Sequence, residues 1–310
     1  MNTKALTLAL FTVAIWGSSF SAISASLQGG YSAGHLLLVR FLIASIIFVF
    51  IALWPGVNFR LPQKEDIFKI VILGFIGISI YHLCVTFGQL SISAGTAGML
   101  IGSAPIFTTI IAIIVLKEHL GKIGWLGLAF GFIGILLIAL GTGSSSLGIS
   151  PGVFLVLIAA LSTAIFFVYQ KSLFKKYSAI ELTAYFTWVG TIPFMFFAPG
   201  LFEGIQHASL EANLSAIYIG VFPTAIAYLM WAMALSYSKA SSVSNTLYLE
   251  PVVAIIVTWI WLHELPSTLS IVGGFVAITS VILVNMFGKT HQLKLSTQAP
   301  TPAYDKIDIL

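Results

Sequence analysis

A chain of 310 residues that is 58% hydrophobic and only 8% charged has too few polar side chains to cover the surface of a water-soluble domain. Its net charge of +4 would suggest a nucleic-acid partner in a soluble protein. Here the basic residues lie in short segments between apolar runs, where water and anionic lipid headgroups are the expected partners. The composition therefore predicts an all-α integral membrane protein without a nucleic-acid partner.

Ten runs of mostly apolar residues are long enough to cross a bilayer, which takes about 17–25 residues in a helix. Each run should be helical, because lipid offers no hydrogen-bond partner to free backbone groups. The first run could pass for a secretory signal peptide, but it is long enough to span and has a counterpart deep in the chain, so we expect it to be the first span. The runs cover residues 6–26, 34–54, 67–88, 95–116, 123–141, 150–170, 180–199, 213–235, 243–262 and 268–287.

The basic residues are distributed unevenly between the segments that join these runs. With the N-terminus inside, thirteen of the fourteen Lys and Arg residues fall on one side of the membrane, and the joints on the other side contain none. The fourteenth, Arg40, lies within the second run. We therefore expect a multi-pass protein of the cell membrane with both termini cytoplasmic.

One motif occurs twice along the chain. Pro105 is followed thirteen residues later by Glu118, and Pro251 is followed thirteen residues later by Glu264, so both pairs are displaced by 146 residues. Each copy of the chain around this motif holds five runs. Because five is odd, the second copy must enter the membrane from the opposite side.

The predicted architecture is therefore ten transmembrane helices arranged as two inverted five-helix repeats. The first repeat covers residues 1–142, the second covers residues 150–287, and residues 288–310 form a polar cytoplasmic tail. Inverted repeats are typical of transporters that expose a central site alternately to the two sides of the membrane.

Glu250 is the large difference between the two copies of the motif, because Ala104 occupies the equivalent position. It comes about seven residues into its run, which places it roughly 10 Å deep. An ionised carboxylate at that depth needs a wet cavity or a partner. Glu250 is thus a candidate substrate or proton site; the alternative is a packing role beside a kink at Pro251.

Two further ionisable residues lie within predicted spans. Arg40 is about six residues from the outer end of its run, so it could reach outward to the interface, or it could face a cavity and attract a substrate carboxylate or pair with Glu250. His82 could bind substrate or carry protons, or it could be satisfied by a carbonyl of a neighbouring helix.

Aromatic side chains accompany these residues at positions that can face the inside of a bundle. Such rings could stack on a flat substrate, although many membrane aromatics are packing residues or interface anchors. Asn245, three residues before Tyr248, could add a neutral hydrogen bond. The aromatic candidates are Trp16, Tyr81, Tyr228, Trp231 and Tyr248.

The repeated residues of the motif favour structural roles. Pro105 and Pro251 would let their helices bend. Glu118 and Glu264, each between two spans, could accept backbone N–H groups at the start of the next helix. The sequence contains one cysteine, Cys84, and no metal-spaced cluster or phosphate-binding loop, so we expect no metal and no cofactor.

These patterns together resemble the drug/metabolite transporter superfamily, specifically its EamA-type members. The likeness rests on Trp16-Gly17-Ser18-Ser19-Phe20, Arg40-Phe41, Pro105 with Glu118, and Leu249-Glu250-Pro251 with Glu264. It implies two five-helix repeats, a central cavity and, in most members, export of amino acids or other small metabolites. Because a Glu-Pro in this span recurs in the family, Glu250 points more to a shared mechanism than to a particular substrate.

We accordingly expect a secondary transporter, not an enzyme, that exports a small metabolite such as an amino acid by alternating access, with protons as a possible coupling ion. A broad-specificity drug efflux protein or an importer is the alternative within transport. An intramembrane enzyme or lipid-handling protein using Glu250 and His82 as acid and base is the alternative of another class. Catalysis needs no access from both sides, so the paired repeats argue against it. Whether the protein is a monomer or a homodimer stays open.

Overall fold

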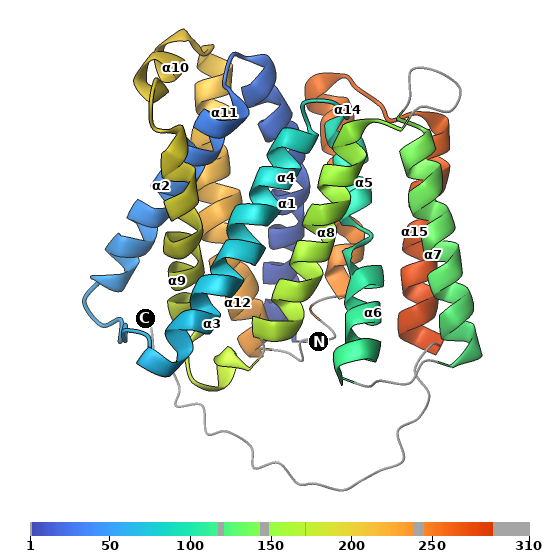
Figure 1. Cartoon of the computed structure of the whole chain (residues 1–310), viewed down its shortest axis with the longest axis horizontal. Helices are drawn as coiled ribbons and strands as arrows, with labels where there is room; N and C mark the ends of the chain where they lie inside the picture. Colours follow the sequence, from blue (N-terminus) through green and yellow to red (C-terminus); the bar gives the residue numbers. More distant parts are fainter. Residues whose placement is uncertain are drawn as a thin grey trace, which may run out of the picture.

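The computed structural model describes residues 2–116, 121–142, 149–170, 172–237, 243 and 245–287. Within these residues the chain forms helices and no strand. In this described part of the chain, eight helices are long and apolar enough to cross a membrane, and two shorter apolar helices, Thr246–Leu262 and Thr268–Val284, follow them. Most of the helices run side by side between two ends of the molecule (Figure 1). Glu118 and the predicted tail at 288–310 lie outside the described residues.

The first half of the chain contains α1 (Thr3–Gln28), α2 (Ala33–Ala52), α3 (Lys64–Gly74), η1 (Phe75–Ile80), α4 (Tyr81–Gly88), α5 (Ala94–Ile101), α6 (Ala104–Leu116) and α7 (Lys122–Leu140). The second half contains α8 (Pro151–Gln170), η2 (Leu173–Lys175), α9 (Ala179–Thr191), η3 (Ile192–Phe197), α10 (Leu201–His207), α11 (Leu210–Val221), η4 (Phe222–Ile226), α12 (Ala227–Tyr237), η5 (Asn245–Leu249), α14 (Glu250–Leu262) and α15 (Thr268–Phe287).

Polar side chains set where several helices begin. The hydroxyl of Ser32 caps α2 by accepting a hydrogen bond from the backbone N–H of His35. Ser178 and Glu181 form a reciprocal capping box at the start of α9. These caps satisfy backbone donors that a helix end leaves free, so the apolar runs start at defined residues.

Two spans contain a π-helical segment in their middle. The segment η1 separates α3 from α4, and η4, which contains Pro223, separates α11 from α12. A π turn widens the helix and frees a carbonyl from the regular ladder, and such turns are frequent at functional sites. Both segments adjoin the candidate site described below.

Two other spans are interrupted beside the repeated prolines. The break between α5 and α6 falls at Gly102 and Ser103, and Pro105 lies in the first turn of α6. Likewise α14 begins at Glu250, with Pro251 in its first turn. Proline is tolerated there because the first-turn N–H groups have no partner within the helix. Gly102 packs so closely against Pro251 that a Cβ would collide with the ring, so the two broken helices cross at their breaks.

The helices α7 and α15 form a close pair through glycine. A Cβ on Gly134 would lie 2.6 Å from the backbone nitrogen of Ala277, and a Cβ on Gly273 would lie 2.7 Å from the carbonyl oxygen of Gly134. The hydroxyl of Ser280 donates to the carbonyl oxygen of Gly127 at 2.7 Å. Small residues let the two backbones approach closely.

Two glycine contacts elsewhere mirror each other. Gly74 packs against the carbonyl oxygen of Phe186, and Gly220 packs against the carbonyl oxygen of Arg40. Gly220 lies 146 positions after Gly74, and Phe186 lies 146 positions after Arg40. The glycine of each contact therefore corresponds to the glycine of the other, but the two contacts take their glycines from opposite halves of the chain.

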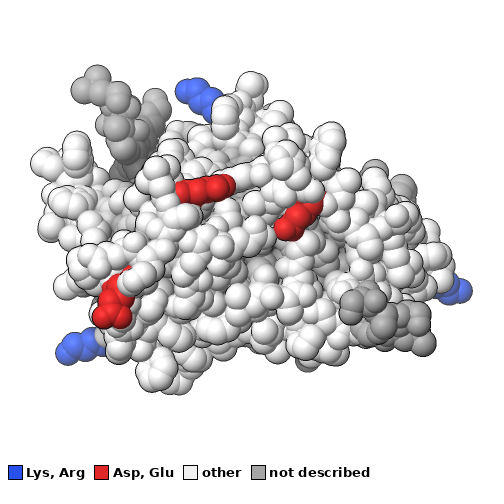
Figure 2. Space-filling model, turned by 90° about the horizontal axis from the view of Figure 1, so that it is seen from above, with Lys and Arg blue, Asp and Glu red and all other residues white. Residues whose placement is uncertain are grey.

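The two ends of the molecule differ in charge. At the end where α1, α3 and α7 begin, which we call the basic end, Arg60 pairs with Glu181 (3.1 Å) and Lys176 pairs with Asp66 (2.9 Å). Figure 2 shows the opposite end, which carries α10: acidic side chains lie on this face and basic ones appear only at its margin.

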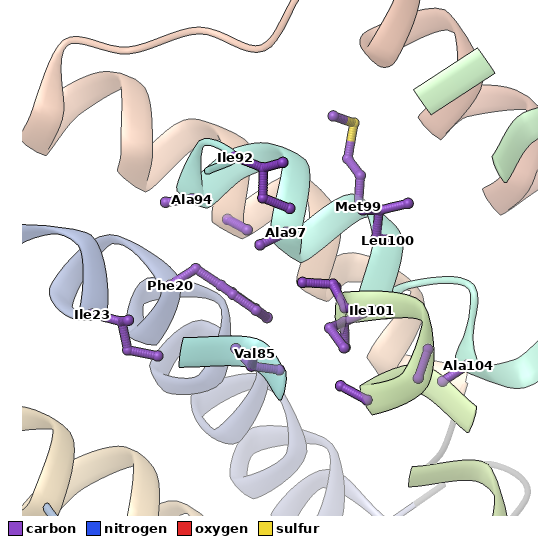
Figure 3. Packing of buried hydrophobic residues seen from close by; sticks show 14 of the residues in the cluster. Phe20, Ile23, Val85, Ile92, Ala94, Ala97, Met99, Leu100, Ile101 and Ala104 are labelled. Atoms are coloured by element: carbon purple, nitrogen blue, oxygen red, sulfur yellow. The ribbon is translucent and has the colours of Figure 1, made fainter. Parts of the chain in front are cut away.

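The apolar core fills the space between α1, α4, α5 and α8. Phe20 and Ile23 of α1 lie beside Val85 of α4, and Ile92 and Ala97 continue the cluster near the start of α5 (Figure 3). All five side chains are buried. The cluster closes this part of the bundle on the side of the end that carries α10.

Candidate functional site

Three of the predicted aromatic residues meet in one cluster. The ring of Trp16 lies 5.3 Å from that of Tyr228 in an edge-on arrangement and 5.3 Å from that of Trp231. Its indole N–H donates to the carbonyl oxygen of Pro223 at 3.0 Å. This carbonyl belongs to the π segment η4, so the irregular helix holds the orientation of the tryptophan.

These three rings form one wall of a small hollow with a volume of about 50 Å³. Its lining also includes Gln170, Phe174 and Ala179, where α8 ends and α9 begins, toward the basic end. Pockets for small molecules typically measure about 300–1,000 Å³. The hollow must therefore widen to take a substrate. Its full lining is Trp16, Ile78, Phe166, Phe167, Gln170, Phe174, Ala179, Leu182, Thr183, Phe186, Tyr228 and Trp231.

Arg40 is buried, with 3% of its surface exposed, so the alternative in which it reaches outward to the interface is wrong. Its Nε donates to the hydroxyl of Thr224 at 2.9 Å, and Thr224 in turn donates to the carbonyl oxygen of Ile219. The guanidinium carbon lies 5.3 Å from the centre of the Phe41 ring. Its Nη1 has no hydrogen-bond partner among the described residues, which leaves a donor for a bound ligand.

His82 is packed between rings. The imidazole lies 4.8 Å from Phe41 and 4.6 Å from Tyr81, edge-on to both, and is 3% exposed. Neither ring nitrogen has a partner among the described residues, so the alternative in which a helix carbonyl satisfies this histidine is wrong.

Glu250 is half-buried at the first position of α14, beside the break in its span. A Cβ on Gly17 would lie 3.1 Å from the backbone carbonyl oxygen of Glu250, which places Glu250 against α1 beside Trp16. Glu250 therefore adjoins the aromatic cluster, and η4 links that cluster to Arg40 through Pro223 and Thr224. The helix N-terminus also favours a negative charge at this position.

Other predicted residues lie apart from this cluster or are only partly described. Tyr248 is half-buried in η5 and packs against the core. Asn245 begins η5, but its side chain lies outside the description. Glu264 accepts a hydrogen bond from the amide of Gln28 (3.1 Å), and Ser267 caps α15, so the expected capping role of Glu264 is wrong.

Sequence reasoning missed the apolar and neutral residues of the site. Phe166 and Phe186 line the hollow, and Thr224 anchors Arg40. The repeat contained a signal for two of them, because Phe166 is the counterpart of Phe20, and Phe186 is the counterpart of Arg40, at the offset of 146. No group of three or more His, Cys, Asp or Glu side chains that could hold a metal occurs in the described part of the chain.

Comparison with known proteins identifies a family and relatives of the chain. The model of the EamA-like transporter family matches the chain twice, over residues 3–140 and 150–286. The uncharacterized transporter YdfC of Bacillus subtilis (strain 168) is 39% identical over 269 residues, which cover 87% of each chain. A probable terminal-alkyne amino-acid exporter of Streptantibioticus cattleyicolor is 33% identical over 283 residues, covering 91% of this chain and 94% of the relative.

A crystal structure of another protein shares the fold, with a TM-score of 0.62 at 15% identity over 91% of this chain and 96% of that chain. The bundle of apolar helices and these relatives define a multi-pass membrane transporter. The chain belongs to the EamA-like transporter family.

Proposed function

We propose that the protein is a secondary transporter that exports a small metabolite, an amino acid or a similar amphipathic compound, across the cell membrane. The observation that carries this proposal is that the buried Arg40, with its free Nη1 donor, and Trp16 of the aromatic hollow are both anchored on η4, while Glu250 packs against Gly17 beside Trp16. Opposite charges at one site suit a zwitterion, and the rings suit an apolar side chain. The relative named as an amino-acid exporter adds support.

The transport cycle would be alternating access by two inverted repeats, residues 1–142 and 150–287, which together form ten transmembrane helices. Two findings support this arrangement: the family model matches each half separately, and the contacts of Gly74 and Gly220 exchange their partners at the repeat offset. The lysines and arginines at the basic end would place that end, and both termini, in the cytoplasm. The hollow then lies on the cytoplasmic side of the site.

In this proposal Arg40 attracts the substrate carboxylate through its unoccupied Nη1 donor. Trp16, Tyr228 and Trp231 pack against the apolar part of the substrate. Glu250 receives the substrate ammonium or a proton, so that substrate and proton compete for one carboxylate. Competition of this kind couples export to proton entry.

Flux into inverted membrane vesicles, measured with a panel of metabolites and with or without a protonophore, tests the proposal. We expect the substrate to accumulate against its gradient and the protonophore to abolish accumulation. Glu250→Gln should lower accumulation at least ~10-fold while substrate exchange without a gradient persists. Glu203→Gln, which changes an exposed carboxylate in α10, is the matched control. Accumulation like that of the wild type by Glu250→Gln at every pH would rule out the proton role.

A further inference from the structure

Three buried polar side chains, two in α4 and one on the residue that follows its last turn, have hydrogen-bonding atoms without partners among the described residues. They are both ring nitrogens of His82, the hydroxyl of Thr86, and both the oxygen and the nitrogen of the Gln89 amide. Their residues are 3%, 1% and 6% exposed. A buried polar atom without a partner is costly in a native protein, and several within two helical turns call for an explanation.

The three residues form a continuous stripe. Their spacing of four and then three residues places them on one face of the helix. The stripe extends over seven residues, or about 10 Å along the helix axis. It begins at His82, next to Phe41 and Arg40, and ends at Gln89, where α4 reaches the end of the molecule that carries α10.

The stripe therefore leads away from the candidate site in the direction opposite to the hollow. The hollow extends toward the basic end, whereas the stripe runs toward the acidic end, where buried apolar side chains close the bundle beside it. The closure beside the stripe is apolar: Val85 of the same helix packs with Phe20, Ile23 and Ile92 (Figure 3). Both ion pairs of the described residues lie at the basic end, so this closure is made without them.

We propose that Thr86 and Gln89 line the route by which substrate leaves the site toward the acidic end. In the conformation described here the route is closed and the polar atoms are inaccessible to solvent. When the apolar cluster separates, water and the polar groups of the substrate supply the missing hydrogen bonds. The cost of leaving these atoms without partners raises the free energy of the closed state and so favours opening. This inference rests on the proposed alternating access.

The stripe also restricts what can pass. A hydroxyl and an amide offer donors and acceptors but no charge, so they can exchange hydrogen bonds with either the ammonium or the carboxylate of a zwitterion. A hydrocarbon solute offers the hydroxyl and the amide no hydrogen-bond partner. The route therefore suits solutes with a hydrogen-bonding head group and disfavours purely apolar compounds.

Cysteine labelling tests the route without measuring transport. The single native cysteine, Cys84, lies on the same helix, half-buried, and points away from the stripe. Thr86→Cys and Gln89→Cys are made in a Cys84→Ser background, and a charged, membrane-impermeant methanethiosulfonate is applied to the outer side of right-side-out vesicles. We expect both new cysteines to react at least ~10-fold faster than Cys84 in the native chain. Equal rates at all three positions would overturn the proposal.

A second pair of variants separates a route from a structural role. Thr86→Val and Gln89→Leu replace the buried polar atoms without partners by apolar groups of similar shape. These changes should leave thermal stability unchanged or raise it. Export of the substrate should nevertheless fall at least ~10-fold. Stable variants with export like that of the wild type would contradict the route. If the wild type transports none of the tested compounds, the proposed function fails, while the labelling rates still decide whether the stripe opens to the outside.

Discussion

The hydroxyl oxygens of Ser45 in α2 and Thr191 in α9 lie 2.9 Å apart, and the two residues are separated by the same 146 positions that relate Pro105 to Pro251. In a molecule built from two copies related by a two-fold axis, a residue can touch its own counterpart only at the axis. This hydrogen bond therefore marks where the axis of the proposed inverted repeat would pass, between α2 and α9.

The Ser45–Thr191 contact predicts a cross-link. With both residues changed to cysteine in a Cys84→Ser background, and with a protease site inserted between the two halves of the chain, mild oxidation should join the halves through a disulfide. After proteolysis the cross-linked chain would run as one band on a non-reducing gel and as two after reduction. Ser45→Cys with Thr187→Cys, one turn away on α9, is the control and should stay uncross-linked. Two bands for the first variant under oxidation would show that the contact does not persist.

Arg40 depends on Thr224 for its position. Thr224→Val removes the hydroxyl that receives the Arg40 Nε–H and leaves a buried charge with one partner fewer. We expect substrate affinity to fall roughly 10-fold or more, while Thr224→Ser, which keeps the hydroxyl, stays near the wild type. Binding measured by tryptophan fluorescence or calorimetry in detergent would show the difference. An unchanged affinity in Thr224→Val would mean that Arg40 needs no anchor in η4.

How much of this could be predicted from the sequence depends on the kind of force involved. Helix positions follow from apolar runs and local caps such as Ser32, and the charge difference between the ends follows from counting Lys and Arg. The same reasoning could not decide whether the Arg40 side chain reaches outward to the interface or faces a cavity, because its depth in the span allowed both. Only the packing of α2 against η4 buries it and supplies Thr224 as its partner.

Hydropathy could not identify the phenylalanines of the hollow, for a different reason. Phe166 and Phe186 are apolar, and hydropathy is the same whether a phenylalanine faces lipid, the core or a cavity. The π turns at Phe75–Ile80 and Phe222–Ile226 leave no local signature, apart from Pro223, because tertiary packing widens the helix there. The wider turns shift the faces of α4 and α12 relative to an ideal helix, so spacing alone could not show which side chains meet.

The ion pair between Lys176 and Asp66 should make stability depend on pH in the alkaline range. Hydrogen bonding to Asp66 raises the pKa of Lys176 above its ordinary value of 10.5. A raised pKa contributes stability that is fully present below 10.5 and is lost as the pH rises through the folded-state pKa. Lys176→Met should therefore melt a few degrees lower than the wild type at pH 7–9, roughly 1–3 °C for a partly exposed pair, and the difference should shrink above about pH 10.5.

Thermal unfolding in detergent across this pH range would measure the effect. Lys175→Met, which changes the neighbouring lysine outside the two described ion pairs, is the matched control and should melt like the wild type at every pH. A difference for Lys176→Met that stays constant up to pH 11 would contradict the assignment.

The contact between α7 and α15 predicts a strong effect of small substitutions. Gly134→Ala places a methyl group 2.6 Å from the backbone nitrogen of Ala277, and backbone cannot move aside as a flexible side chain can. We expect a loss of about 1–3 kcal/mol for Gly134→Ala and more for Gly134→Val. Ile133→Val, on the neighbouring half-exposed residue, should be nearly neutral. Unfolding of the three variants in parallel, in denaturant or by heat, would rank them; equal stability of Gly134→Val and Ile133→Val would rule out the close contact.

The pair of helices α7 and α15 offers a fixed reference for distance measurements within the molecule. Because α7 and α15 touch backbone to backbone through Gly134 and Gly273, little side-chain volume can rearrange between them. Their outward residues Phe130 and Phe275, 53% and 67% exposed, can carry spectroscopic labels whose separation should stay constant throughout a transport cycle. Distances from that fixed pair to labels on any other helix would then report the motion of that helix alone.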